Sequence, residues 1–182
     1  MSLSLLGPAA PSFDEPLEML DACHGRIKAQ LATLRRLVTH LPQHGADRAA
    51  QEAARGVVRY FSVAAPHHHE DEEVDLLPTL LATAVGAELA VTEALVARIL
   101  ADHQRMDPLR DAAIALLEKI AAGENVPLPA AQVETLATLY LEHIEMETRE
   151  LFPLARRLLS PAQTEELGRR MSARRGVVFG AA

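Results

Sequence analysis

The chain contains one pattern twice, as HHEDEEVDLLP at residues 68–78 and as HIEMETRELFP at residues 143–153. In both copies a histidine is followed four positions later by a glutamate, and two apolar residues and a proline complete the pattern. His68 and His143 are 75 positions apart, and the glutamates and prolines share this offset. Residues four apart lie on one face of an α-helix, so each copy presents an imidazole beside a carboxylate. Two such faces brought together form a cage of nitrogen and oxygen donors, which suits iron better than magnesium or calcium.

The composition is typical of a helical protein with its own core. Of the 182 residues, 49% are apolar and only 3% are aromatic, and a chain rich in alanine and leucine favours close-packed helices over sheets. This length fits one domain spanning residues 1–182. Cys23 is the only cysteine, which excludes an intramolecular disulfide and a thiolate zinc site and favours the reducing cytoplasm.

Charge and hydropathy narrow the range of partners. Residues 1–11 lack a basic start and a long apolar run, and no segment approaches ~20 uninterrupted apolar residues, so we expect neither secretion nor membrane insertion. A formal net charge of −7 disfavours nucleic acid as a partner. One group of arginines near the C-terminus is interpreted as a solvated helix end: Arg169, Arg170, Arg174 and Arg175.

Apolar residues recur three and four positions apart in four long stretches, which predicts helices over about residues 17–41, 47–84, 87–122 and 129–159. Prolines punctuate this pattern. Pro42 and Gly45 should end the first helix, Pro66 and Pro78 should bend the second, and Pro108 should interrupt the third.

A short fifth helix should follow at about residues 161–174, because Ser160 and Pro161 are favourable N-cap and first-turn residues. The loops between the long helices are short, and short loops join antiparallel neighbours. The sequence therefore predicts an all-α, antiparallel, up-and-down four-helix bundle over about residues 17–159, followed by a short C-terminal helix.

When the four helices are folded antiparallel, six polar residues on their apolar faces fall into one layer of the bundle. They are His24, His68, Glu72, His103, His143 and Glu147. A lone histidine on an apolar face is usually a core residue satisfied by a hydrogen bond. Burying two carboxylates without a cation, however, costs several kcal/mol each or forces their protonation. Four histidines and two glutamates in one layer therefore predict a metal site.

These residues resemble those of the hemerythrin-like, HHE cation-binding family. Its pattern is a lone histidine, a His-x-x-x-Glu motif followed by a Leu-Phe-Pro-like triplet, a second lone histidine, and a second His-x-x-x-Glu with Leu-Phe-Pro. The resemblance covers about residues 17–159. It implies a non-haem di-iron centre held by the six residues of the layer, with Glu72 and Glu147 bridging the two metals. Zinc or manganese are substitutes that the same donors accept.

One position departs from the oxygen-carrying members of that family. They supply a second histidine four residues after the position of His103, where this chain has Asp107. Asp107 has two candidate roles, as a further metal ligand or as the cap of a helix that restarts at Pro108. The departure leaves four histidine ligands where the carriers have five, which weakens the case for reversible dioxygen carriage.

The first copy of the pattern lies within HHHEDEE at residues 67–73, where two other His-x-x-x-Asp/Glu pairs have the same spacing. The apolar stripe of the helix and the 75-residue offset both select His68 with Glu72. We expect the other candidates to contact the ligands from outside or to face solvent: His67, His69 and Glu73. An acidic run of this kind is typical of a solvated helix face.

The resemblance implies a protein that binds, senses or detoxifies a small oxidant such as dioxygen, peroxide or nitric oxide. Three alternatives stay open at this point: a di-iron enzyme that consumes peroxide or nitric oxide, an iron-delivery protein for iron–sulfur cluster repair, and a structural bundle stabilised by metal. We expect a small diatomic or peroxide ligand as the partner, and neither nucleic acid nor membrane. The sequence does not set the oligomeric state.

Overall fold

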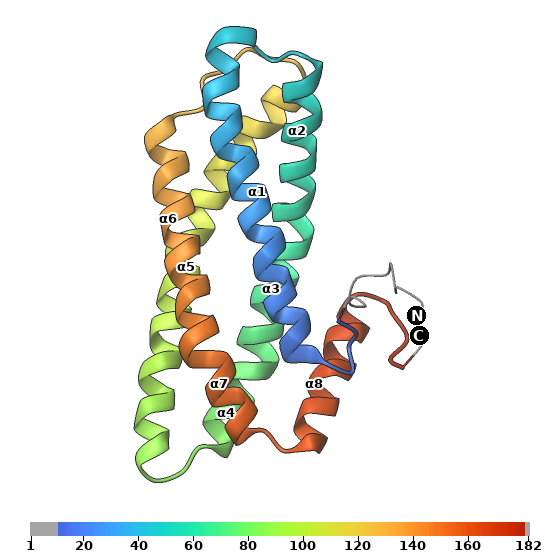
Figure 1. Cartoon of the computed structure of the whole chain (residues 1–182), viewed down its shortest axis with the longest axis vertical. Coiled ribbons are helices and arrows are strands. Elements are labelled where there is room, and N and C mark those ends of the chain that lie inside the picture. The colour runs from blue at the N-terminus through green and yellow to red at the C-terminus, as the bar shows by residue number, and fades with distance from the viewer. Residues whose placement is uncertain (1–10, 181–182) are drawn as a thin grey trace, which may run out of the picture.

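The computed structural model of the chain describes residues 11–180, and all regular structure in this range is helical. Four antiparallel helical rods form a bundle and a fifth helix lies against its side (Figure 1). The predicted all-α four-helix bundle is therefore confirmed. None of the helices within residues 11–180 is both long and apolar enough to cross a membrane.

The first rod is α1 (Pro16–His44), and the third is α5 (Ala87–Ala121). The second and fourth rods combine α-helix with π-helical turns. The second comprises α2 (Arg48–Arg59), η1 (Tyr60–Ala64), α3 (Ala65–Glu70), η2 (Asp71–Leu76) and α4 (Leu77–Thr83). The fourth comprises α6 (Ala130–Met146), η3 (Glu147–Leu151) and α7 (Phe152–Leu158), and the helix beside the bundle is α8 (Pro161–Arg174).

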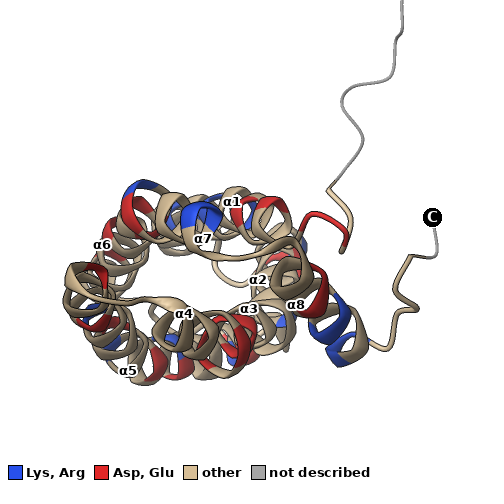
Figure 2. Cartoon of the chain, turned by 90° about the horizontal axis from the view of Figure 1, so that it is seen from below, with Lys and Arg blue, Asp and Glu red and all other residues tan. Residues whose placement is uncertain are grey.

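Each rod packs against its neighbours in chain order, and the ring closes between the first and the last. α1 contacts α2 and α6, and α5 contacts the same two helices from the opposite side. The view along the bundle axis shows this ring, with α8 outside it (Figure 2). Every rod therefore turns one face towards the shared axis.

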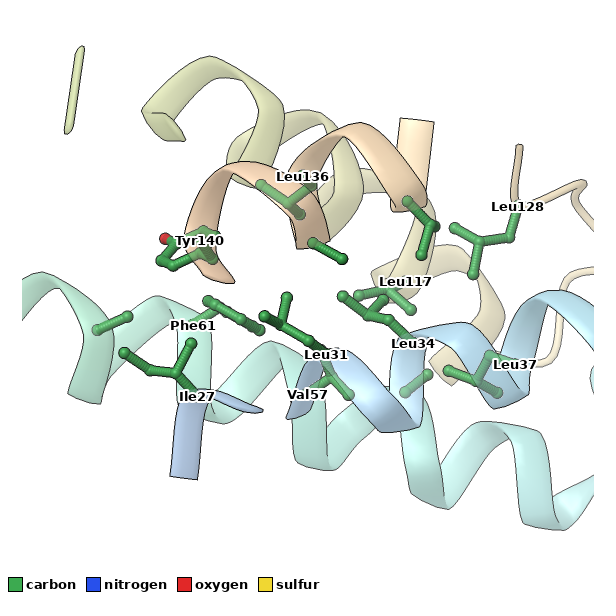
Figure 3. Close-up of a cluster of buried hydrophobic side chains, with 14 of the residues drawn as sticks. Ile27, Leu31, Leu34, Leu37, Val57, Phe61, Leu117, Leu128, Leu136 and Tyr140 are labelled. Atoms are coloured by element: carbon green, nitrogen blue, oxygen red, sulfur yellow. The ribbon is translucent and has the colours of Figure 1, made fainter. Parts of the chain in front are cut away.

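Two apolar clusters fill the bundle, one on each side of a polar layer. The cluster towards the α1–α2 loop contains Ile27 and Phe61 and is drawn in Figure 3. The cluster towards the α4–α5 loop contains Leu20 and Leu76. On α1 the two clusters meet around His24, which is 2% exposed. The apolar seam of the sequence thus continues on both sides of this histidine.

Three prolines coincide with the three π-helical turns. Pro66, Pro78 and Pro153 each lie two residues after a π-helical segment ends. A proline has no N–H to donate, and its ring clashes with the carbonyl four residues earlier. In all three cases that carbonyl belongs to the π-helical segment, where the wider turn accommodates the clash. The bends predicted at Pro66 and Pro78 therefore take the form of π-helical turns.

The prolines inside α1 and α5 disrupt their helices less than we expected. α1 passes through Pro42 and ends at His44, beside the predicted Gly45, and α5 runs through Pro108 without an interruption. Each proline removes one backbone hydrogen bond, and the packing of these long helices in the bundle outweighs that loss. Sequence reasoning therefore placed the helices well but overestimated the breaking effect of these two residues.

The interpretation of the C-terminal arginines as a solvated helix end holds for Arg169 but was wrong for the other three. Arg174 donates hydrogen bonds to both Asp71 and Asp75, Arg175 donates to Asp71, and Arg170 donates to Asp75. Both aspartates are buried, at 0% and 4% exposure. Part of the acidic run that we expected to be solvated is therefore covered by α8, which is held on η2 by ion pairs.

Arg174→Leu should lower the free energy of unfolding by roughly 3 kcal/mol, the low end of the range for a broken buried ion pair. The buried carboxylates would lose their central partner while two arginines remain. Urea denaturation of the metal-free protein, followed by helical circular dichroism, measures the change. Arg169→Leu is the matched control, because Arg169 pairs with the exposed Glu165, and it should have little effect. Equal effects of both variants would contradict a structural role for the buried network.

Candidate metal centre

Six polar side chains from all four rods meet in the layer between the two apolar clusters. Each is between 0% and 2% exposed. They are His24 on α1, His68 on α3 and Glu72 on η2, His103 on α5, and His143 on α6 and Glu147 on η3. The bundle therefore brings together the six residues of the predicted layer, although the second rod and the fourth rod reach it through a π-helical turn.

The six side chains form two overlapping groups whose donor atoms lie within 4.8 Å of one another. One group pairs His24 and His68 with the two glutamates. The other pairs His103 and His143 with the same two glutamates. Each group thus offers two imidazoles of its own, while both carboxylates belong to both groups.

The individual distances show how the carboxylates are shared. In Glu147, Oε2 lies 3.0 Å from Nε2 of His24 and Oε1 lies 2.9 Å from Nε2 of His143. In Glu72, Oε1 lies 3.4 Å from Nε2 of His68. Its other oxygen, Oε2, lies 3.5 Å from Nε2 of His103. Each carboxylate therefore places one oxygen beside each histidine pair, which is the arrangement of a bridging ligand.

Most donor atoms of this layer have no hydrogen-bond partner among residues 11–180, despite these short distances. They are Nε2 of His24, both ring nitrogens of His68, Nδ1 of His143, and all four carboxylate oxygens of Glu72 and Glu147. Buried polar atoms are normally paired, and leaving one unpaired costs about 1–3 kcal/mol. Converging nitrogen and oxygen lone pairs of this kind are donors that cations bind. The donor set thus fits two metal ions.

The electrostatics of the chain alone also point to a missing positive charge. Burial raises the pKa of Glu72 well above its usual value, and the charge of Glu147 adds to the shift. Burial would also raise the pKa of Glu147, but the close approach of the His143 and His24 imidazoles holds it well below the usual range. Burial lowers the pKa of His68 to about 3, so it is a neutral donor. Without cations, only one of two fully buried carboxylates is favoured as an anion.

The neighbours of the selected motif occupy three different positions. His67 is half-buried, whereas His69 is 6% exposed and stacks on His103, with ring centroids 3.9 Å apart and an angle of 9° between the planes. Glu73 reaches His103 from the outside, with Oε1 at 2.6 Å from Nδ1. The lone pairs of two stacked imidazoles run parallel, so His69 and His103 are poorly arranged to chelate one ion together. His69 and Glu73 instead contact a ligand from outside the layer.

Asp107 belongs to neither group of donors. Its side chain is 51% exposed, and its Oδ1 accepts a hydrogen bond of 2.7 Å from Arg110. Because α5 is continuous through Pro108, no new helix begins there for Asp107 to cap. The structure thus supports neither of the two roles considered from the sequence. Its position four residues after His103 does not make Asp107 a metal ligand. The six residues of the layer face the bundle axis, whereas the carboxylate of Asp107 faces the surface of the bundle.

Comparison with known proteins agrees with this geometry. The family model of the hemerythrin HHE cation-binding domain matches residues 15–155, which include all six residues of the layer. The chain belongs to this family. A Haemophilus influenzae protein named only as uncharacterized is 31% identical over 166 residues, covering 91% of this chain and 93% of its own length. Membership supports a metal-binding function for the layer.

His68→Ala should remove about half of the bound metal, because it deletes one of the four donors in one of the two groups. His67→Ala is the matched control on the same helix, since His67 lies outside both groups. Elemental analysis of each purified variant measures the difference, and helical circular dichroism checks that both remain folded. Equal metal loss in the two variants would show that the wrong helix face has been assigned.

Asp107→Asn should leave both the metal content and the absorption of the oxidised centre unchanged, because the carboxylate pairs with Arg110 instead of facing the layer. Glu147→Gln provides the comparison, since it removes one of the two shared carboxylates and should lower metal content strongly. A changed absorption spectrum in the fully metallated Asp107→Asn variant would indicate that Asp107 is a metal ligand and would contradict its assignment outside the layer.

Proposed function

We propose that this protein is a non-haem di-iron protein that binds, senses or detoxifies a small oxidant such as dioxygen, peroxide or nitric oxide. One observation carries the proposal: each of two buried carboxylates presents one oxygen to each of two histidine pairs. Carboxylates shared between two imidazole pairs in the core of a helical bundle are a recurring way to hold two iron ions.

The number of donors supports redox or ligand-binding chemistry over a closed structural site. Each metal position would receive two imidazole nitrogens and one oxygen from each of the two glutamates. Iron commonly takes six ligands, and sites with few protein donors keep positions open for exogenous molecules. When bound, such an iron pair supplies reversible one-electron changes at two adjacent metals. Zinc or manganese would satisfy the same donors, so the metal itself needs measurement.

The burial of the layer restricts what reaches it. All six side chains are at most 2% exposed, and apolar clusters cover them on both sides along the axis. A bulky substrate would have to separate the rods, whereas a diatomic molecule or peroxide needs little space. The apolar walls also exclude water, which strengthens the electrostatic interactions of the carboxylates. These features favour a small oxidant.

Iron delivery to damaged iron–sulfur centres is less well supported, because releasing a metal held by four buried residues requires the bundle to open. A structural role for the metal is the remaining alternative, and it predicts metal occupancy without reactivity.

The sole cysteine, Cys23, is buried, which fits a protein of the reducing cytoplasm. The formal net charge of the chain, −7, argues against nucleic acid as a partner.

Protein purified from iron-replete cells should contain about two iron ions per chain. The reduced protein should change its absorption spectrum on separate exposure to air, hydrogen peroxide and nitric oxide. Recovery of the reduced spectrum after oxygen is removed would identify a binder, and catalytic loss of peroxide or nitric oxide would identify an enzyme. Glu72→Gln is the ligand variant and Glu145→Gln, which changes an exposed residue on α6, is its control.

Two results would count against the proposal. A chain that takes up only traces of metal, even after reconstitution of the metal-free protein, would exclude a di-iron protein. Full occupancy without a response to any of the three oxidants would favour the structural bundle.

A further inference from the structure

The residue after each shared glutamate contacts a lone histidine on a neighbouring rod. Glu73 follows Glu72, and its Oε1 lies 2.6 Å from Nδ1 of His103. Thr148 lies 75 positions after Glu73, and its Oγ1 is 3.4 Å from Nδ1 of His24. The repeated pattern thus places an outer partner on each lone histidine, and in both cases the contact is made to the nitrogen that faces away from the carboxylates.

The two outer partners differ in chemistry. A histidine that binds a metal through Nε2 usually donates its Nδ1–H to an acceptor, and this contact fixes the ring orientation and raises the basicity of the ligand. A carboxylate at 2.6 Å is a strong, charge-assisted acceptor. A hydroxyl at 3.4 Å is at the outer limit of hydrogen bonding. His103 is therefore held and polarised much more strongly than His24.

The other two histidines extend the same asymmetry. Nδ1 of His143 lies 3.7 Å from Oδ2 of Asp102, a carboxylate that is 21% exposed. Nδ1 of His68 has no hydrogen-bond partner among the residues that the structure describes. The carboxylate near His24, on Asp21, is 3.8 Å away and 53% exposed. Outer negative charge is therefore concentrated on the pair formed by His103 and His143.

Stacking adds a second constraint on His103. The ring of His69 lies parallel to it at 3.9 Å, and the ring centroids of His69 and Tyr140 are 6.2 Å apart with an angle of 22°. His24 also stacks on an aromatic ring, that of Phe152, at 5.2 Å. Both lone histidines thus have their ring planes defined by a neighbour, and the clearest difference between them is the charge of the partner at Nδ1.

We propose that the two metal positions are inequivalent, and that Glu73 is the positioning residue that makes the position of His103 and His143 the tighter one. The inference rests on the proposed function, because it requires both positions to take metal. Glu73 does not touch the metal; it acts through His103, holding Nε2 towards the layer and increasing its donor strength.

The test is an anaerobic titration of the metal-free protein with Co²⁺, followed by the visible absorption of the bound ion. Wild-type protein should bind two ions in separate steps. His103→Ala should abolish the tighter step and His24→Ala should abolish the weaker one, which identifies the position that fills first. Helical circular dichroism verifies the fold of each variant.

Glu73→Gln then isolates the role of the charge, because glutamine keeps the size and an acceptor oxygen of the side chain. We expect it to weaken the tighter step by about 10- to 100-fold, the usual effect of losing an outer partner, and to leave the weaker step within a few-fold. Thr148→Val is the matched variant at the repeated position. It should change only the weaker step, and by less.

The outcomes separate this inference from the function on which it rests. Two bound ions with equal affinities, or a tighter step that Glu73→Gln leaves unchanged, would overturn the inference and leave the proposed function standing. Failure to bind Co²⁺ and iron at all would overturn the proposed function and the inference with it. An equal loss in both steps would show that Glu73 supports the whole bundle, and this too would overturn its assigned role.

Discussion

The complete burial of Glu72 and Glu147 at the centre of the bundle is the constraint on which the rest of the molecule depends. Two carboxylates in an apolar interior repel each other and lose their hydration, so without cations one of them is driven towards protonation. The histidines supply only part of the missing charge: burial lowers the pKa of His68, whereas the proximity of Glu147 and Asp102 outweighs burial and raises the pKa of His143. Cations between the two histidine pairs would offset both the repulsion between the carboxylates and the loss of their hydration. The apolar clusters on either side of the layer disfavour hydration by water in place of cations.

The backbone reaches this arrangement through π-helical turns. η2 and η3 begin beside or at the shared glutamates, and each is followed by the proline of its motif. The proline ring displaces the carbonyl four residues earlier, and the wider turn absorbs that displacement without ending the rod. As a result, adjacent residues in η2 contact different neighbours: Glu72 faces the axis, while Asp71 is buried against Arg174 of α8 and the following Arg175. The prolines of the repeated pattern therefore belong to the construction of the layer.

The two halves of the bundle are similar at the layer and different around it. In the second copy, Met146 takes the place of Asp71, and it packs in the apolar cluster instead of pairing with α8. Thr148 takes the place of Glu73, so an outer carboxylate is exchanged for a hydroxyl. The ligands are thus duplicated while their surroundings are not. Two metal ions in such a site experience different charges at the back of their ligands, which is a route to different affinities and potentials.

The sequence by itself determined the bundle, the helix positions and the six residues of the layer, because helical periodicity assigns each residue to a face and the repeated motif selects one face of residues 67–73. Only the tertiary structure decided which groups surround that layer. Asp107 has the spacing of a ligand but pairs with Arg110, whereas Glu73 is one position out of register and reaches His103. The sequence indicated that the C-terminal arginines form a solvated helix end, but Arg174 of α8 donates a hydrogen bond to the buried Asp75. The physical reason is that periodicity specifies direction along one helix, while contacts across rods depend on π-helical turns and on the packing of α8, neither of which a helical repeat encodes.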